Sequence, residues 1–384
     1  MTRPLPTLPF EIILEIFRDE DLSESDLARL CLVSRGVLDS VRVTLYDDID
    51  IYFVPPPQTV QHRPRSNDLL EASTCCLLRT LQENLELSLL VQNIEIYYTL
   101  DDAPSPSRIF LPIPLGVSMF LELVPNLKSV TIGNTLSSSL AQILNILGDH
   151  AEKIQELYIW SRIEREHGFT ATNFPQLKKL LASQVEDGTG TACVGLVHLE
   201  DLSILCSVFP YSRVDLLEQS KSTLKELGIN AGFASTLDYS GFTQLRYLHL
   251  HDYEVDEYAS IRHSDERPNF DRFWSKLQQA PTLSVLSFEG ERYNGRLEED
   301  LFGSSVRPGV QLQNIRRIRF EESIPLDRIA RLIHAPLLPN LRQVVVDYAV
   351  GDEESPGERL ARIEAASTLC STRGIDLLIS GWTG

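Results

Sequence analysis

Two histidines separated by a single residue, His249 and His251, are the side chains whose spacing best suits metal binding. In an extended strand, residues two apart point to the same face, so both imidazoles could reach one ion. A protein site for a metal such as zinc normally has three or four protein ligands. No carboxylate or cysteine of this strand joins the two histidines on their face. We therefore expect no metal and no cofactor.

Catalytic motifs are the next chemistry to consider. The sequence contains no G-x-S-x-G nucleophile elbow, no P-loop and no H-E-x-x-H zinc motif. The segment DGTGT at 187–191 is similar to the aspartyl-phosphate motif of P-type pumps, but it differs at the second residue and no membrane helices accompany it. A glycine-rich connection is the better interpretation. We predict that the chain is not an enzyme.

The two histidines belong to a pattern that recurs over most of the chain. In residues 243–252, Leu245, Leu248 and Leu250 form the pattern Leu-x-x-Leu-x-Leu. Ten segments of this kind begin at Val91, Leu127, Ile154, Leu177, Leu199, Leu224, Leu245, Leu283, Ile315 and Leu341. Six of the nine steps between these residues fall between 21 and 27 residues, within the period of leucine-rich repeats.

Amphipathic segments lie between the repeated segments. Four have helical spacing: 139–150, 270–280, 326–334 and 357–369. Alternating strands and helices at this period predict an α/β solenoid, with a curved parallel sheet inside and helices outside. Residues 374–380 are expected to form a closing strand, and the three longest steps predict insertions near 99–118, 252–275 and 289–311.

Each repeated strand should have one buried side and one side facing the concave surface. If the first, fourth and sixth positions enter the core, the third, fifth and seventh face outward. The outward positions include an aromatic and apolar strip of the kind found at protein interfaces: Tyr158, Trp160, Leu181, Leu205, Tyr247 and His249, with His251 beside it. Arg317 and Arg319 add a basic spot suited to an acidic or phosphorylated peptide. Alternatively, the inserted loops cover this face, and its apolar residues are simply buried.

The N-terminal segment differs from the repeats, since residues 5–46 have the pattern of three short helices. The runs LPFEIILEIF, RDEDLSESDL and ARLCLVSRGVLDSVRVTLYDDI resemble an F-box motif over residues 5–49. The resemblance implies docking onto the Skp-type adaptor of cullin-RING ubiquitin ligases. It assigns that contact to Leu8, Pro9, Ile12, Ile13, Ile16, Phe17 and Val33. In the alternative, the helices only cap their own chain.

Composition and charge limit the kinds of partner that the chain could bind and the compartments in which it could act. The formal net charge of −19 disfavours nucleic acid. No apolar run is long enough for a membrane helix, and the N-terminus lacks the features of a secretory signal. Without export, the six cysteines should be reduced, and we expect them to be small buried side chains in a protein of the cytoplasm, the nucleus or both.

These observations combine into one expectation. We predict two domains, an F-box at 1–47 and a leucine-rich-repeat solenoid at 48–384. By resemblance to fungal F-box proteins with such repeats, the chain would be the non-catalytic substrate receptor of an SCF-type cullin-RING ubiquitin ligase. Its partners would be the adaptor with its cullin complex and a protein target. The alternative from another class is a leucine-rich-repeat scaffold or inhibitor that acts outside ubiquitination.

Overall fold

The described residues of this computed structural model fall into two compact units. They are residues 35–54, 69–70, 72–98, 113–133, 137–163, 174–185, 199–207, 220–230, 234, 237–251, 270–289, 310–320, 337–347 and 356–380. Unit 1 comprises residues 1–161, 166–169 and 173–177, and unit 2 comprises 162–165, 170–172 and 178–384. The first two predicted F-box helices and the predicted helix at 326–334 lie outside the described residues.

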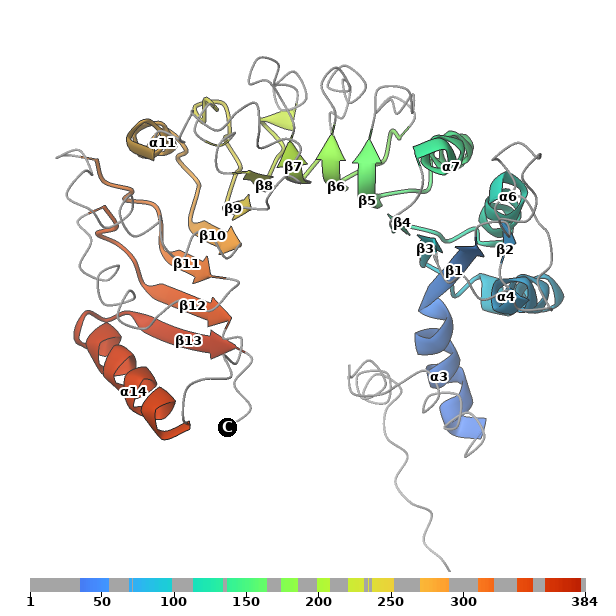
Figure 1. Ribbon diagram of the computed structural model, residues 1–384, viewed down its shortest axis with the longest axis horizontal. Helices are drawn as coiled ribbons and strands as arrows, with labels where there is room; N and C mark the ends of the chain where they lie inside the picture. The colour runs from blue at the N-terminus through green and yellow to red at the C-terminus, as the bar shows by residue number, and fades with distance from the viewer. Residues whose placement is uncertain are drawn as a thin grey trace, which may run out of the picture. The chain divides into compact units, whose positions relative to one another are not determined.

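Unit 1 is a mainly parallel sheet with most of its helices on one side (Figure 1). Its parallel strands are adjacent in chain order: β1 (Asp48–Val54), β3 (Asn93–Tyr98), β4 (Ser129–Ile132) and β5 (Glu156–Ile163). The short strand β2 (Leu69–Leu70) pairs antiparallel with β1 at the edge. The helices of this unit are α3 (Arg35–Asp47), α4 (Ala72–Glu83), α5 (Leu85–Ser88), α6 (Ile113–Leu123) and α7 (Ser137–Asp149).

Unit 2 repeats the same arrangement. Its strands, again neighbours in chain order, are β6 (Lys179–Val185), β7 (Asp201–Ser207), β8 (Glu226–Asn230), β9 (Tyr247–His251), β10 (Val285–Glu289), β11 (Arg317–Phe320), β12 (Gln343–Asp347) and β13 (Asp376–Ser380). The printed pairs from β6 to β13 are all parallel. Among its described helices are α11 (Phe270–Leu277) and α14 (Pro356–Thr372).

The strand register confirms the alignment predicted from the leucine pattern. Leu248 of β9 is opposite Leu227 of β8 and Leu286 of β10, as the pattern requires. The side chains at the first, fourth and sixth positions form the core, and Leu245, Leu248 and Leu250 are each 0 % exposed. A repeat-like α/β array of parallel strands, compatible with a leucine-rich-repeat solenoid, is therefore present in both units.

Successive repeats are joined by the same backbone contact. The carbonyl of Gln92 accepts the N–H groups of Lys128 at 2.7 Å and Ser129 at 3.1 Å, and the carbonyl of Lys225 accepts those of Arg246 at 2.8 Å and Tyr247 at 3.1 Å. The same double contact recurs at the start of most other described strands. Because the backbone makes it, the contact is independent of the side chains that vary between repeats.

A polar side chain directly before the first apolar residue often adds a second tie to the preceding repeat. The Asn340 amide donates to the Gln313 carbonyl at 2.8 Å. The Thr282 hydroxyl donates to the Leu245 carbonyl at 2.8 Å, and the Thr223 hydroxyl donates to the Leu199 carbonyl at the same distance. The sequence pattern, which considers only apolar positions, does not predict these contacts.

We expect Thr282→Val to lower the free energy of unfolding by about 0.5–1.5 kcal/mol, the usual net contribution of one hydrogen bond. Valine keeps the branched shape and removes the donor to Leu245. Urea unfolding followed by circular dichroism measures the change. The matched control is Thr368→Val on α14, whose hydroxyl donates within its own helix to Glu364. An equal effect of the two substitutions would contradict a role of Thr282 in joining repeats.

The structure adds one detail to the sequence prediction and corrects another. Helix α6 begins at Ile113, so the insertion expected at 99–118 contains the start of a helix. Pro114 is compatible with this helix because a residue of the first turn does not need its N–H for an intrahelical hydrogen bond. The cysteines are also not uniformly buried. Cys370 is 0 % exposed and its burial raises the pKa of the thiol, whereas Cys76 is exposed on α4.

Two further features concern the predicted boundaries. The closing strand expected at 374–380 is present as β13, and β1 adds one more strand in register before the ten repeats. Within the described ranges, none of the helices combines the length and apolar character needed to cross a membrane.

Candidate functional site

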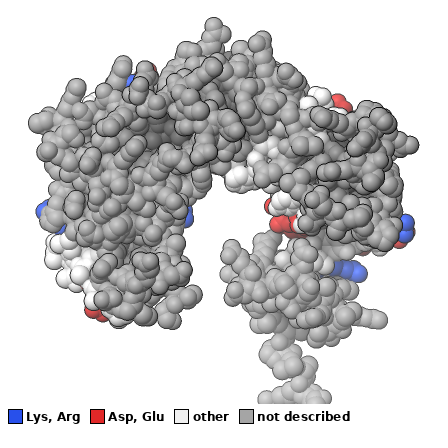
Figure 2. Space-filling view, viewed as in Figure 1, with Lys and Arg blue, Asp and Glu red and all other residues white. Residues whose placement is uncertain are grey.

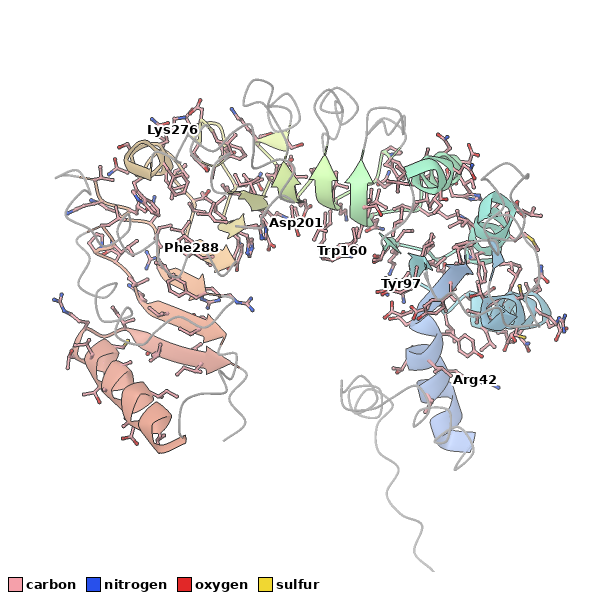
Figure 3. All side chains as sticks on the ribbon, viewed as in Figure 1. Arg42, Tyr97, Trp160, Asp201, Lys276 and Phe288 are labelled. Atoms are coloured by element: carbon pink, nitrogen blue, oxygen red, sulfur yellow. The ribbon has the colours of Figure 1, made fainter. Side chains whose placement is uncertain are left out.

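The side of the unit 1 sheet opposite the core carries three rows of side chains, set by the strand register. The first row runs through Asp48, Asn93, Ser129 and Glu156, and the second through Asp50, Glu95, Thr131 and Tyr158. The third contains Tyr52 and Tyr97, followed on β4 and β5 by Gly133 and Trp160. We call these three rows the unit 1 face. Figure 3 shows Tyr97 and Trp160 pointing away from α6 and α7.

The third row is largely aromatic. The rings of Tyr52 and Tyr97 are stacked, with centroids 5.5 Å apart and an interplanar angle of 18°. A Cβ atom at Gly133 would lie 2.9 Å from Cδ1 of Tyr97, so the Tyr97 ring occupies the space that a side chain on β4 would take. Trp160 is 44 % exposed, which is unusual for a tryptophan of a folded protein. The glycine therefore lets the aromatic row extend from β1 toward β5.

Carboxylates stand beside these rings. The Tyr52 hydroxyl donates to Asp50 at 2.7 Å, the Tyr158 hydroxyl donates to Glu156 at 2.8 Å, and the Tyr97 hydroxyl donates to Glu95. The hydrogen bond to Glu95 is the main reason why the pKa of Tyr97 is raised. In all three pairs the phenol is the donor, and the hydrogen bond holds the carboxylate in place beside the ring.

The sequence contains a signal for this arrangement that the leucine pattern does not use. An acidic residue, an aliphatic residue and a tyrosine follow one another in β1, β3 and β5, at residues 50–52, 95–97 and 156–158. Because alternate residues of a strand share a face, each triplet places a carboxylate and a phenol on the same side. Only Tyr158 of these six polar residues belongs to the interaction strip predicted from the sequence.

The corresponding side of unit 2 has a different character around β9. The rings of Tyr247 and His249 stack with centroids 6.5 Å apart, and those of His249 and His251 stack at the same separation. His251 is 5 % exposed, and its Nε2 lies 3.3 Å from Oγ of Ser203, reaching across β8 at Gly228. His251 thus lies on the predicted face but offers little surface to a partner.

Arg317 and Arg319 lie on the same side of unit 2 as Tyr247 and His249. The register places Tyr247 and Arg317 on either side of Val285 and places His249 and Arg319 on either side of Ser287. Both arginine residues are exposed. Recognition of an acidic or phosphorylated peptide by this pair stays a prediction.

The other predicted site residues are distributed unevenly. Tyr158 and Trp160 belong to unit 1, and Leu181 is half-buried in unit 2, where the Leu205 side chain is outside the described atoms. The predicted adaptor contacts all lie outside the described residues: Leu8, Pro9, Ile12, Ile13, Ile16, Phe17 and Val33. In the part of the chain that the structure describes, no three His, Cys, Asp or Glu side chains gather closely enough to hold a metal ion.

Comparisons with known proteins give no family for this chain. No family model matches it, and no curated protein matches it. A crystal structure of a Bacteroides fragilis protein, solved as a structural genomics target, is similar over 86 % of this chain and 73 % of its own length, with 11 % sequence identity and a TM-score of 0.32. A likeness at this level carries no argument about function.

Proposed function

We propose that this chain is a non-catalytic substrate receptor of an SCF-type cullin-RING ubiquitin ligase. In this proposal, residues 1–47 act as an F-box that binds a Skp-type adaptor, and the leucine-rich repeats bind a protein target. Ubiquitin transfer would be performed by other subunits. The receptor would contribute by raising the effective concentration of the target at the transfer site.

The observation that carries the proposed target-binding role is the exposed sheet face. One side of the repeated strands is core, whereas the other bears partly exposed aromatic and charged side chains, with Trp160 44 % exposed and both Arg317 and Arg319 exposed. Aromatic residues and arginine are enriched at protein interfaces and often contribute most of the binding energy. Such a surface is suited to binding another protein.

The connection between the proposed F-box and the repeats supports the same role. Helix α3 covers the third of the three short helices that the residue pattern predicts over 5–46, and β1 begins at the residue after it. Val41 of α3 is 0 % exposed, and the Asp47 carbonyl accepts the Gln92 N–H at 3.0 Å. An adaptor held by this segment would therefore be joined to unit 1 without a flexible linker at the α3–β1 junction.

The packing of α3 also favours the second candidate, a repeat scaffold or inhibitor outside ubiquitination. In that case the N-terminal helices would serve as a cap, which solenoids require to cover the exposed end of their core. Burial of Val41 fits both candidates. A measurement of adaptor binding distinguishes the two candidates.

The test is co-expression of the full chain with a Skp-type adaptor, followed by measurement of the adaptor retained in affinity purification. We expect the double substitution Ile13→Asp and Phe17→Asp to reduce retention at least tenfold, because it places two charges in the proposed apolar docking surface. Leu360→Asp is the matched control, since Leu360 is a 42 % exposed leucine on α14, far along the chain from the proposed F-box.

Equal retention by wild type and the double variant would refute the proposal, as would failure of the wild-type chain to retain the adaptor. A truncation that separates adaptor partners from repeat partners should remove residues 1–34 only. Removing 1–47 would also delete α3 and the fully buried Val41, and would therefore damage unit 1.

A further inference from the structure

The unit 1 face combines aromatic rings and carboxylates without a basic residue in its three rows. Its acidic members are Asp48, Asp50, Glu95 and Glu156. Tyr52, Tyr97 and Trp160 stand in the row beside them. Figure 2 shows acidic side chains (red) next to uncharged ones (white) on the side of unit 1 turned away from its helices.

We propose that the unit 1 face binds an extended, arginine-rich segment of a partner protein. The inference rests on the proposed role of the sheet face in binding a target, and it names the chemistry of that target. The aromatic row is the main support for this proposal. Carboxylates alone would attract any cation, whereas rings and carboxylates together select a planar cationic side chain.

Arginine fits both components of this face. A guanidinium can stack on the face of tyrosine or tryptophan and at the same time donate to a carboxylate. Asp50 and Glu95 each accept one tyrosine hydroxyl, and a carboxylate has about four acceptor positions in all, so capacity remains for an incoming donor. Because the tyrosines already orient these carboxylates, little side-chain entropy is lost when the cation binds.

The spacing of the face suits an extended chain rather than a single small cation. Adjacent strands of a sheet are about 4.8 Å apart, so Tyr97 on β3 and Trp160 on β5 are separated by roughly 10 Å of sheet. An extended segment advances about 3.3 Å per residue, so two cationic side chains that lie two or four residues apart, on the same side of the segment, span roughly 7–13 Å. A segment lying across the strands could therefore place one cationic side chain near Tyr97 and Glu95 and another near Trp160 and Glu156.

The experiment measures binding of the full chain to two fluorescent 12-residue peptides by anisotropy at about 150 mM salt, a concentration that weakens diffuse attraction between charges. One peptide alternates arginine and serine, and the other has glutamine in place of arginine. We expect only the arginine peptide to bind. Glu95→Gln and Trp160→Ala should each weaken it about three- to tenfold, the effect of losing one ion pair or one cation–π contact.

The matched control is Glu226→Gln. Glu226 starts a repeated strand of unit 2, so this substitution removes the same charge from a different face. Glutamine at 95 can still accept the Tyr97 hydroxyl, so the aromatic row should be preserved in Glu95→Gln. A further variant, Gly133→Val, removes no contact group but places atoms where the Tyr97 ring lies, with Cβ already 2.9 Å from Cδ1. We expect this variant to weaken binding by a similar factor.

Equal binding of the two peptides would overturn the proposal. An equal loss in Glu226→Gln and Glu95→Gln would also overturn it, because the attraction would then come from the overall charge of −19. The same conclusion would follow if Trp160→Ala and Gly133→Val bound like wild type. Thermal unfolding of each variant identifies any that are misfolded. Since no adaptor is present in this assay, its failure would leave the proposed adaptor binding to be judged by co-purification.

Discussion

Replacing Leu248 by alanine is expected to lower the free energy of unfolding by about 2–5 kcal/mol, the range for large-to-small substitutions in protein cores. Leu248 is 0 % exposed in β9, at the fourth position of the repeat that begins at Leu245, and it lies between Leu227 and Leu286 on the neighbouring strands. The cost has two parts, the lost transfer of apolar surface from water and the cavity left between repeats. Because each repeat contacts mainly its neighbours, little compensation from the rest of the chain is expected.

The measurement is urea unfolding followed by far-ultraviolet circular dichroism, with Leu378→Ala as the matched control. Leu378 is also a strand leucine of unit 2, but it is 49 % exposed on β13 and points to the other side of the sheet. We expect a loss below about 1 kcal/mol for the control, as for surface positions in general. Similar shifts of the two midpoints would show that Leu248 is not in a tightly packed core.

The register of the sheet could be predicted from the sequence because the apolar pattern determines it. A shift by one residue would turn Leu248 and Leu250 out of the core and turn Tyr247 and His249 into it. The same requirement holds in each repeat, so one alignment satisfies all the strands from β3 to β12. The aliphatic residues of β1 follow the same rule, but β1 and β3 are too far apart in the chain for the repeat period to indicate that they are neighbours.

The composition of the exposed face could be predicted only in part. Alternation places Tyr158 and Trp160 outward, and the structure agrees. It does not indicate that Tyr97 leans over Gly133, or that His251 turns toward Ser203, two strands away. These contacts depend on side-chain rotamers and on the absence of a side chain on the intervening strand, and neither follows from an apolar pattern.

Gly228 is the clearest case of such a position, and Gly228→Ala is expected to lower the free energy of unfolding by about 1–3 kcal/mol, the usual cost of overpacking. A Cβ atom at this residue would collide with Oγ of Ser203 and lie 2.7 Å from Nε2 of His251. His251 is 5 % exposed and stacks on His249, which limits how far its ring can move. Differential scanning calorimetry and urea unfolding both measure the change.

Gly357→Ala is the control, because the same methyl group is added where no atom lies within 4 Å. Gly357 is in α14, and alanine stabilises a helix relative to glycine by up to about 1 kcal/mol, so the effect should have the opposite sign. A steric cause at Gly228 further predicts that Ser203→Ala partly relieves Gly228→Ala. The coupling between the two substitutions should be about 0.5–3 kcal/mol, as for other residues in contact. Additive effects of Gly228→Ala and Ser203→Ala would mean that the cost does not come from the contact with Ser203. If the cost comes instead from displacement of His251 alone, Gly228→Ala should show the coupling with His251→Ala.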